Sequence, residues 1–305
     1  MNSVLVIGAS GFVGAALVER LVAKGHKVYG LSRRPPAQAD NLVPLEGDIL
    51  LPNFGLEKVP KDIHAIHHLA AIHQLGEDKS GEIWETNVLG TENVISFCIR
   101  YDIPHLYFTS TAYTQGRNTY ERSKALCETM ISESAIPTVT IFKPPIIMGT
   151  PQHFYPGHFS QFVGLLVKIH QRAEVVRRKI EGSLRLPVLE PVFRMKANPK
   201  GKINLVQIDQ VARAMAQIKK PGVWWLTHPN PPTIEQLMEW VGEFIMVKIK
   251  IESSFKSTPI EAMFEKMAAP FIPYLWGDAF PSHLKGCPPI TKEFIQETVK
   301  RSLQG

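Results

Sequence analysis

Tyr120 and Lys124 are the two residues whose types and spacing carry the clearest chemistry. They are four positions apart in a stretch predicted to be helical over residues 120–134, so both side chains lie on one helix face, one turn apart. An unperturbed phenol has a pKa of about 10 and is a poor proton donor or acceptor near neutrality. A nearby ammonium group favours the phenolate and lowers that pKa. The spacing therefore predicts a general acid–base pair rather than a surface tyrosine packed against a lysine stem.

Hydroxyl side chains follow the fifth predicted strand, residues 105–109. A hydroxyl at such a strand end points into the crevice where ligands of open parallel sheets bind. Thr111 is predicted to hydrogen-bond a reacting carbonyl oxygen beside Tyr120. Ser110 is the alternative, because one step along a strand moves the side chain to the opposite face. Tyr113 is expected to pack locally or to line a substrate pocket.

A glycine-spaced turn lies between a predicted strand at residues 3–7 and a predicted helix at residues 12–24. It reads Gly8-Ala9-Ser10-Gly11-Phe12-Val13-Gly14. The first glycine allows a sharp exit from the strand, the second allows a pyrophosphate to approach the backbone, and the third allows the helix to pack closely on the strand. Free N–H groups at the helix start would then hold the phosphates, which predicts a dinucleotide site.

The end of the second predicted strand, residues 27–31, selects the cofactor. Sites that prefer NAD place a carboxylate there for the ribose 2′-hydroxyl, whereas this chain has Ser32 followed by Arg33 and Arg34. A guanidinium fork binds the 2′-phosphate of NADP with charge-assisted hydrogen bonds. We therefore predict NADP(H), against the alternative that the two arginines are only solvated charge. An oxidised nicotinamide ring would also lower the pKa of Tyr120.

Strands and helices alternate through the first half of the chain. The predicted strands cover residues 3–7, 27–31, 43–46, 64–69, 105–109 and 138–142, and the predicted helices cover 12–24, 82–100 and 120–134. This alternation predicts an α/β fold with a doubly wound parallel sheet. Residues 1–150 are predicted to form an NADP-binding Rossmann domain. Residues 151–305 are predicted to combine returning sheet elements at about 203–227 with a smaller substrate-binding lobe, and to include helices at 209–219 and 233–247.

The composition of the 305 residues is ordinary for a globular enzyme, with 44% hydrophobic and 20% charged residues. The net charge of +6 suits phosphate-bearing small molecules, and no basic run alternates with exposed aromatics, so nucleic acid is not expected as a partner. Three cysteines share no metal-ligand spacing and indicate a reducing cytoplasm. No apolar run reaches transmembrane length, so no membrane partner is expected.

Two clusters of charged or titratable residues have competing interpretations. The segment from residue 168 to residue 202 contains ten Lys or Arg and three acidic residues. This excess of basic residues indicates either an electropositive lobe for a phosphate-bearing substrate or a solvated helix face. The basic positions are 168, 172, 177, 178, 179, 185, 194, 196, 200 and 202. His64, His67, His68 and His73 are close in sequence but have no acidic or cysteine partner at metal-ligand spacing, so no metal site is predicted.

In combination, these motifs resemble those of the extended short-chain dehydrogenase/reductase family. The segment 8–14 resembles the cofactor turn of that family. Gly47-Asp48-Ile49 resembles the family's adenine-contacting loop, and His68-Leu69-Ala70-Ala71 resembles its fourth-strand signature. Thr86-Asn87-Val88 resembles part of the helix that supports the family's active site. Residues 143–149, which include Pro144 and Ile147, resemble the segment that flanks the nicotinamide. Residues 205–212 resemble a later strand–helix signature. The resemblance implies that Asp48, Ile49, Leu69, Ala70, Ala71, Pro144 and Ile147 contact the cofactor together with the turn, Ser32, Arg33, Arg34, Tyr120 and Lys124.

Within that family, residues 110–113 and 226–233 are most similar to the branch of fatty-acyl and thioester reductases. The resemblance implies a catalytic set of Thr111, Tyr120 and Lys124, with Asn87 as a fourth member, and a homodimer formed through the two helices beside the active site. Only eight residues separate Thr111 from Tyr120, so the loop that shapes the substrate pocket is shortened. The implied activity is reduction of a carbonyl or thioester. A nucleotide-sugar epimerase or dehydratase and a non-catalytic NADP(H)-binding regulator are the alternatives.

Overall fold

The computed structural model describes residues 3–184 and 192–304. The chain divides into two compact units, each built from three stretches of chain. The first unit contains Met1–Ile147, Val206–Thr227 and Phe280–Gly286. The second contains Met148–Leu205, His228–Ala279 and Cys287–Gly305.

The first unit is built on a seven-stranded sheet in which every neighbouring pair of strands is parallel. Its order is β10 (Gly222–Trp225), β6 (Thr138–Lys143), β5 (His105–Thr109), β4 (Ile63–His68), β1 (Ser3–Ile7), β2 (Lys27–Ser32) and β3 (Leu42–Glu46). The order reverses direction between β1 and β4, which is where open α/β sheets bind ligands. The predicted doubly wound parallel sheet is confirmed.

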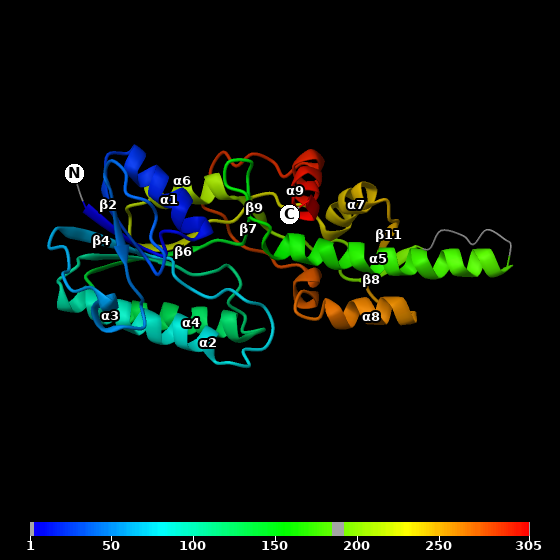
Figure 1. Cartoon of the computed structure of the whole chain (residues 1–305), viewed down its shortest axis with the longest axis horizontal. Helices are drawn as coiled ribbons and strands as arrows, with labels where there is room; N and C mark the ends of the chain where they lie inside the picture. The colour runs from blue at the N-terminus through cyan, green and yellow to red at the C-terminus, as the bar shows by residue number, and fades with distance from the viewer. Residues whose placement is uncertain (1–2, 185–191, 305) are drawn as a thin grey trace. The chain divides into compact units, whose positions relative to one another are not determined.

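Helices cover both faces of this sheet (Figure 1). One face carries α1 (Phe12–Ala23) and α6 (Ile208–Gln217), and the other carries α3 (Gly90–Arg100) and α4 (Thr119–Ser132). On the α3–α4 face, Leu5, Ile66 and Phe108 belong to a core cluster that these helices cover with apolar side chains. Both faces are buried, so the strands are almost uniformly apolar, as the sequence predicted.

The helix predicted over residues 82–100 consists of three consecutive pieces. These are α2 (Glu82–Trp84), the π-helical turn η2 (Glu85–Leu89) and α3. A π-turn inserts an extra residue into the helical repeat and is found frequently at functional sites. Asn87 is at its centre.

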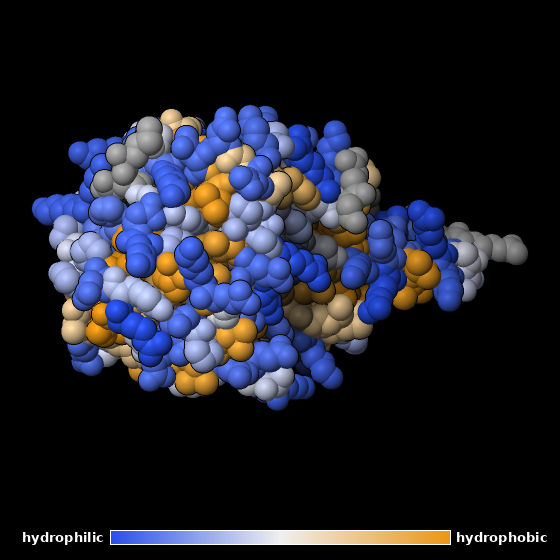
Figure 2. Space-filling view, turned by 60° about the vertical axis from the view of Figure 1, so that its left-hand side comes forward, coloured by the Kyte–Doolittle hydropathy of each residue, from blue (hydrophilic) through white to orange (hydrophobic). Residues whose placement is uncertain are grey.

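One short pair of strands lies outside the seven-stranded sheet. The strand expected at 203–206 is β9 (Leu205–Gln207), which pairs with β7 (Ile146–Met148). β10, by contrast, joins the edge of the seven-stranded sheet. A short 3₁₀ turn, η1 (Pro52–Gly55), follows β3. Polar colour predominates on the face drawn in Figure 2, with smaller hydrophobic areas between.

The second unit is mainly helical. It contains α5 (Gly157–Leu184), α7 (Ile234–Ile245), α8 (Pro259–Met267), η3 (Ile272–Trp276) and α9 (Lys292–Gln304), and β8 (Phe193–Lys196) pairs with β11 (Ile249–Glu252). Aromatic rings hold α5, α8 and the start of η3 together, with Phe162 packed edge-on against both Phe264 and Phe271. Within the described ranges, no helix is both long and apolar enough to cross a bilayer.

Candidate active site

The glycine turn joins β1 to α1 by close backbone packing. Gly8 has φ of 87°, and a Cβ there would lie 2.9 Å from the Ala70 amide nitrogen. A Cβ on Gly14 would lie 2.0 Å from the Gly8 carbonyl oxygen, so a side chain would force helix and strand apart. A Cβ on Gly11 would meet only the Gly8 oxygen, at 3.2 Å. Gly8 and Gly14 therefore serve close packing, whereas the position of Gly11 is less crowded.

The start of α1 fits an anionic group. Gly11 is its N-cap and has no side chain to accept hydrogen bonds from the first turn, which also contains no acidic residue. The first N–H groups of a helix lack intrahelical acceptors and carry the positive end of its dipole. Phe12 and Val13 pack beside Ile147, on the cluster that Ala16 and the α6 residues Ile208 and Ala212 form. The described residues thus fit the pyrophosphate of a dinucleotide, with the segment after β6 beside the turn.

Ser32 connects the end of β2 to the glycine turn. Its hydroxyl accepts a hydrogen bond from the Ser10 hydroxyl at 3.0 Å and donates to the Arg34 carbonyl oxygen at 2.9 Å. Arg33 and Arg34 follow directly and are exposed. Across residues 3–184 and 192–304, neither arginine takes part in an ion pair, so both guanidinium groups are available to an anion at this strand end.

The residues predicted to contact the adenine, and those that follow β4, come after the carboxyl ends of two strands of the same sheet. The Leu69 amide donates to the Ile7 carbonyl at 2.9 Å, which continues the β1–β4 pairing and brings Ala70 and Ala71 to the turn. Asp48 accepts from the Leu50 amide at 3.0 Å and closes its own loop. Ile49 is buried with its side chain against Gly90, and its carbonyl oxygen accepts from the Asn93 side chain at 2.8 Å, so both parts of the residue hold the loop on α3.

Tyr120 lies in the first turn of α4, and a cap places it there. The Asn118 side chain accepts from the Glu121 amide at 2.9 Å, and the helix begins at Thr119. The Tyr120 phenol is hydrogen-bonded to the Thr111 side chain, and Thr111 is buried at the end of β5. The structure therefore brings together the two hydroxyls that the sequence paired.

Burial, and not the neighbouring ammonium, dominates the proton affinity of Tyr120 without a cofactor. Burial raises the pKa of its phenol, the hydrogen bond from Thr111 opposes this, and the charge of Glu121 adds to it. The expectation that Lys124 lowers this pKa is not met, because Lys124 is not among the groups that set it. A phenol with a raised pKa stays protonated at neutral pH but is a weaker acid than a free phenol, so proton donation depends on bound groups that lower this pKa.

Lys124 is almost fully buried one turn after Tyr120. Its ammonium donates to the Thr109 carbonyl oxygen at 2.8 Å and lies 4.7 Å from the centre of the Phe108 ring. Burial lowers the pKa of Lys124 to about 8. An ammonium has three donors, so this contact leaves donor capacity for a ligand hydroxyl.

Asn87 joins the loop after β4 to α4. Its amide oxygen accepts from the Ile72 amide at 2.8 Å, and its amide nitrogen donates to the Ile72 carbonyl at 3.0 Å and to the Ser123 hydroxyl at 2.9 Å. Ser123 in turn donates to the Tyr120 carbonyl at 2.8 Å. Both amide hydrogens of Asn87 are engaged, so its geometry is that of a support for Tyr120 and for residues 71–73.

Ser110, the alternative to Thr111, is directed elsewhere. Its hydroxyl donates to Glu128, which also binds Lys143. Glu128 was not predicted from the sequence, although its spacing of four from Lys124 places it on the same helix face. Lys143 was predicted only as the first residue of the flanking segment, because a lysine at a strand end is normally solvated.

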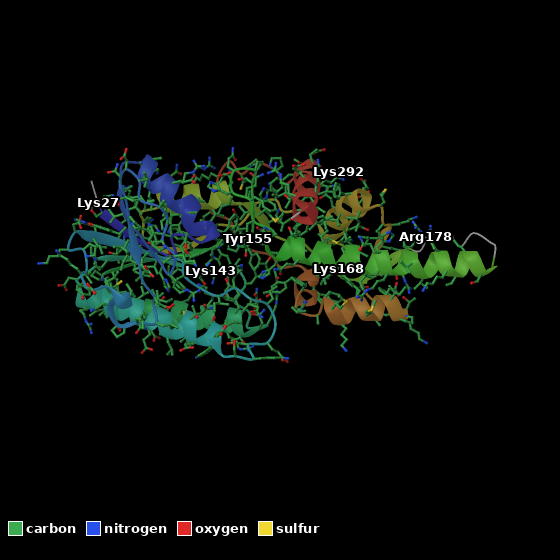
Figure 3. All side chains as sticks on the ribbon, viewed as in Figure 1. Lys27, Lys143, Tyr155, Lys168, Arg178 and Lys292 are labelled. Carbon is green, nitrogen blue, oxygen red and sulfur yellow. The ribbon has the colours of Figure 1, made fainter. Side chains whose placement is uncertain are left out.

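The other predicted clusters have structural partners. Of the basic residues after 168, Arg177 pairs with Glu174 and Glu181 along α5, and Arg194 and Lys196 pair with Glu261 and Glu265. Lys168 and Arg178 project from α5 (Figure 3). Arg185 lies outside the described residues. This pairing reduces the positive charge that the segment can offer to a substrate.

The histidines of β4 are divided between surface and core. His64 is exposed, whereas His67 and His68 are buried and burial lowers the pKa of each to about 3. His67 stacks on Tyr107 with ring centres 4.2 Å apart, and His68 Nε2 is 3.0 Å from the Thr91 hydroxyl. Among the described side chains, no group of three or more His, Cys, Asp or Glu could hold a metal ion.

Two family models match the chain in succession. The NAD dependent epimerase/dehydratase family matches residues 4–134, and the male sterility protein family matches residues 114–215. Together they cover the glycine turn, the Thr111–Tyr120–Lys124 group and the strand–helix signature at β9 and α6. The second match agrees with the predicted similarity to the reductase branch.

Individual relatives align with somewhat more than a third of the chain. The short-chain dehydrogenase/reductase family 42E member 1 of Danio rerio is 32% identical over 114 residues, which are 36% of this chain and 29% of that protein. The 2-alkyl-3-oxoalkanoate reductase of Stenotrophomonas maltophilia is 34% identical over 119 residues, 38% of this chain and 36% of that protein. The alignments thus span about a third of the length of these relatives.

Solved structures show the same fold along the chain. The terminal R domain of the myxalamid biosynthetic pathway superposes with a TM-score of 0.67 at 19% identity, over 100% of this chain and 91% of that domain. A UDP-glucose 4-epimerase of Thermotoga maritima gives a TM-score of 0.63 at 15% identity, over 99% and 100%. Sheet order and glycine turn define a Rossmann-type α/β protein. The family-model matches support the resemblance to the extended short-chain dehydrogenase/reductase family that the motifs predicted.

Proposed function

We propose that this chain is an NADP(H)-dependent oxidoreductase that reduces a carbonyl or acyl-thioester substrate. The observation that carries the proposal is the hydrogen-bonded pair of Thr111 and Tyr120 with the buried Lys124 one helical turn away. They lie at the carboxyl edge of the same parallel sheet whose β1 ends in the glycine turn. Relatives named as reductases support the reaction class.

The chain's own residues account for the proton chemistry. A bound reduced nicotinamide supplies a hydride to the carbonyl carbon. Thr111 holds the carbonyl oxygen, and Tyr120 donates its phenolic proton to that oxygen, so the product is an alcohol. Lys124 uses its remaining donors for the ribose hydroxyls. With a thioester, the carbon–sulfur bond breaks instead, the thiol leaves with a proton, and an aldehyde is formed.

Preference for NADP(H) over NAD(H) is proposed from the end of β2. Ser32 stands where a carboxylate would bind the ribose 2′-hydroxyl, and Arg33 and Arg34 are exposed beside it. Two guanidinium groups suit a 2′-phosphate dianion. The second unit is proposed to select the substrate, consistent with the segment after residue 150 having no part of the glycine turn or the catalytic group.

A nucleotide-sugar epimerase or dehydratase is the second candidate. The family model over residues 4–134 and the similarity to a UDP-glucose 4-epimerase favour it. Such an enzyme returns the hydride to its substrate and retains its cofactor. It would therefore purify with bound dinucleotide and catalyse no net oxidation of added NADPH.

The decisive experiment is a screen of NADPH and NADH oxidation against acyl-thioesters, aldehydes, ketones and nucleotide sugars. We expect substrate-dependent oxidation of NADPH with a carbonyl or thioester and a lower rate with NADH. Identification of the product by mass spectrometry separates reduction from epimerisation. If NADPH neither binds nor is oxidised with any of these classes, the proposal is wrong.

A further inference from the structure

The carboxylate of Glu128 joins the catalytic helix to two strand ends. Lys143, at the end of β6, donates to both of its oxygens, at 2.6 and 2.8 Å. The hydroxyl of Ser110, the residue before Thr111, donates to the same carboxylate. Lys143 is only 5% exposed and lies inside the first unit (Figure 3). One carboxylate on α4 thus holds the ends of both β5 and β6.

The surroundings of Lys143 make this arrangement rigid. Its ammonium also donates to the Thr114 hydroxyl at 3.2 Å and lies 5.0 Å from the centre of the Trp225 ring. Backbone hydrogen bonds pair the two strand ends around it, from the Ser110 amide to the Phe142 carbonyl and from the Ala112 amide to the Pro144 carbonyl, both at 2.8 Å. A buried ion pair is a weak source of stability because desolvation offsets its attraction, so stability alone does not explain it.

We propose that Glu128 is a positioning residue of the catalytic set and that Lys143 is the cation that holds its carboxylate in place. Through Ser110, Glu128 fixes Thr111 beside Tyr120. Through Lys143, it fixes the start of the segment that begins at Pro144. The inference rests on the proposed function, because Thr111, Tyr120 and Lys124 are the groups that it positions.

Glu128 also acts on Lys124 through its charge. Burial lowers the pKa of Lys124 to about 8, while Cys127 and Glu128 act to raise it. The other titratable groups around Lys124 are Tyr120 on α4, His68 on β4 and His73 in the loop after β4. Removal of the Glu128 charge therefore lowers the pKa of Lys124 further, an effect that a purely structural contact would not have.

The test compares Glu128→Gln with the wild-type chain in two measurements. The first follows the titration of Lys124 by NMR of protein labelled with [¹³C]lysine, without cofactor, with Lys124→Met to assign the signal. The second measures kcat for NADPH-dependent reduction and the Kd for NADPH. We expect Glu128→Gln to lower the pKa of Lys124 and to lower kcat by about 10- to 100-fold, because small displacements of reacting groups are costly. The Kd for NADPH should stay unchanged.

Matched variants separate positioning from folding. Glu261 is also a buried carboxylate with a cationic partner, Arg194 at 2.9 Å, but belongs to the second unit, so Glu261→Gln should leave the Lys124 titration and kcat unchanged. If Glu128→Gln does not fold, the double variant Glu128→Gln/Lys143→Met, which leaves no unpaired charge, should show the same loss of kcat.

A folded Glu128→Gln or double variant with the kcat and Lys124 pKa of the wild type would overturn the inference. Failure of the proposed function gives a different result. In that case the wild-type chain neither binds NADPH nor reduces a carbonyl, whereas the Lys124 titration still reports the effect of Glu128.

Discussion

At the scale of single residues, Tyr120 is assigned the proton transfer, and its raised pKa keeps the phenol protonated near neutrality. Tyr120→Phe removes that proton and keeps the ring. We expect kcat to fall by about 10²- to 10⁴-fold, the usual contribution of a general acid, while the Kd for NADPH measured by fluorescence stays unchanged. Turnover at the wild-type rate would remove Tyr120 from the mechanism.

The proposed binding of the 2′-phosphate by Arg33 and Arg34 can be tested by comparing the Kd for NADPH with the Kd for NADH. A hydrogen bond to a charged group contributes about 1.5–3 kcal/mol, so the double variant Arg33→Ala/Arg34→Ala should weaken NADPH binding by at least about 10-fold. NADH lacks the phosphate, and its Kd should remain the same. Arg301→Ala, which removes an exposed arginine paired with Glu297 in the second unit, is the control. Equal losses for NADPH and NADH would show that the two arginines do not read the phosphate.

At the scale of elements, the contact between β1 and α1 depends on Gly14. Gly14→Ala would place a Cβ 2.0 Å from the Gly8 oxygen, so we expect a loss in the free energy of unfolding and weaker dinucleotide binding. Gly164→Ala in α5 is the matched helical control, because no atom lies within 4 Å of its added Cβ. That change should be neutral or stabilising by up to about 1 kcal/mol. Urea denaturation compares both variants, and a Gly14→Ala protein as stable as Gly164→Ala would contradict this packing.

The elements that position the site were largely readable from the sequence, because parallel strands buried on both faces are apolar runs and glycine spacing marks the turn. The π-turn around Asn87 was not predicted, since helical periodicity over nineteen residues does not resolve one inserted residue. The contact of Glu128 with Ser110 and Lys143 was also missed. It forms only when α4, β5 and β6 come together, and no local pattern reports it.

At the scale of the molecule, the sequence comparisons cover less of the chain than the comparison of folds does. The second family model ends at residue 215. The alignments with the two relatives cover only about a third of the length of each relative. The described residues of the glycine turn, together with Thr111, Tyr120 and Lys124, all belong to the first unit. The second unit, with its long α5 and its paired basic residues, is where the substrate assignment has to be tested. The homodimer expected from the family stays a prediction.

The stability of the first unit should depend on pH through His67 and His68. Burial lowers the pKa of each to about 3 in the folded chain, against an ordinary value of 6.5. A histidine with a depressed folded pKa stays neutral in the fold but gains a proton in the unfolded chain, so its contribution to stability is present above pH 6.5 and is lost as the pH falls toward 3.

Linkage predicts that acidification from pH 7.5 to 5.5 lowers the free energy of unfolding by about 1.4 kcal/mol for each histidine. Urea denaturation followed by circular dichroism at the two pH values measures this difference. His67→Phe keeps a ring against Tyr107, stacked at 4.2 Å in the native chain, and should remove one histidine's share of the pH dependence. A variant whose stability changes with pH as steeply as the wild type would show that His67 already binds its proton in the fold.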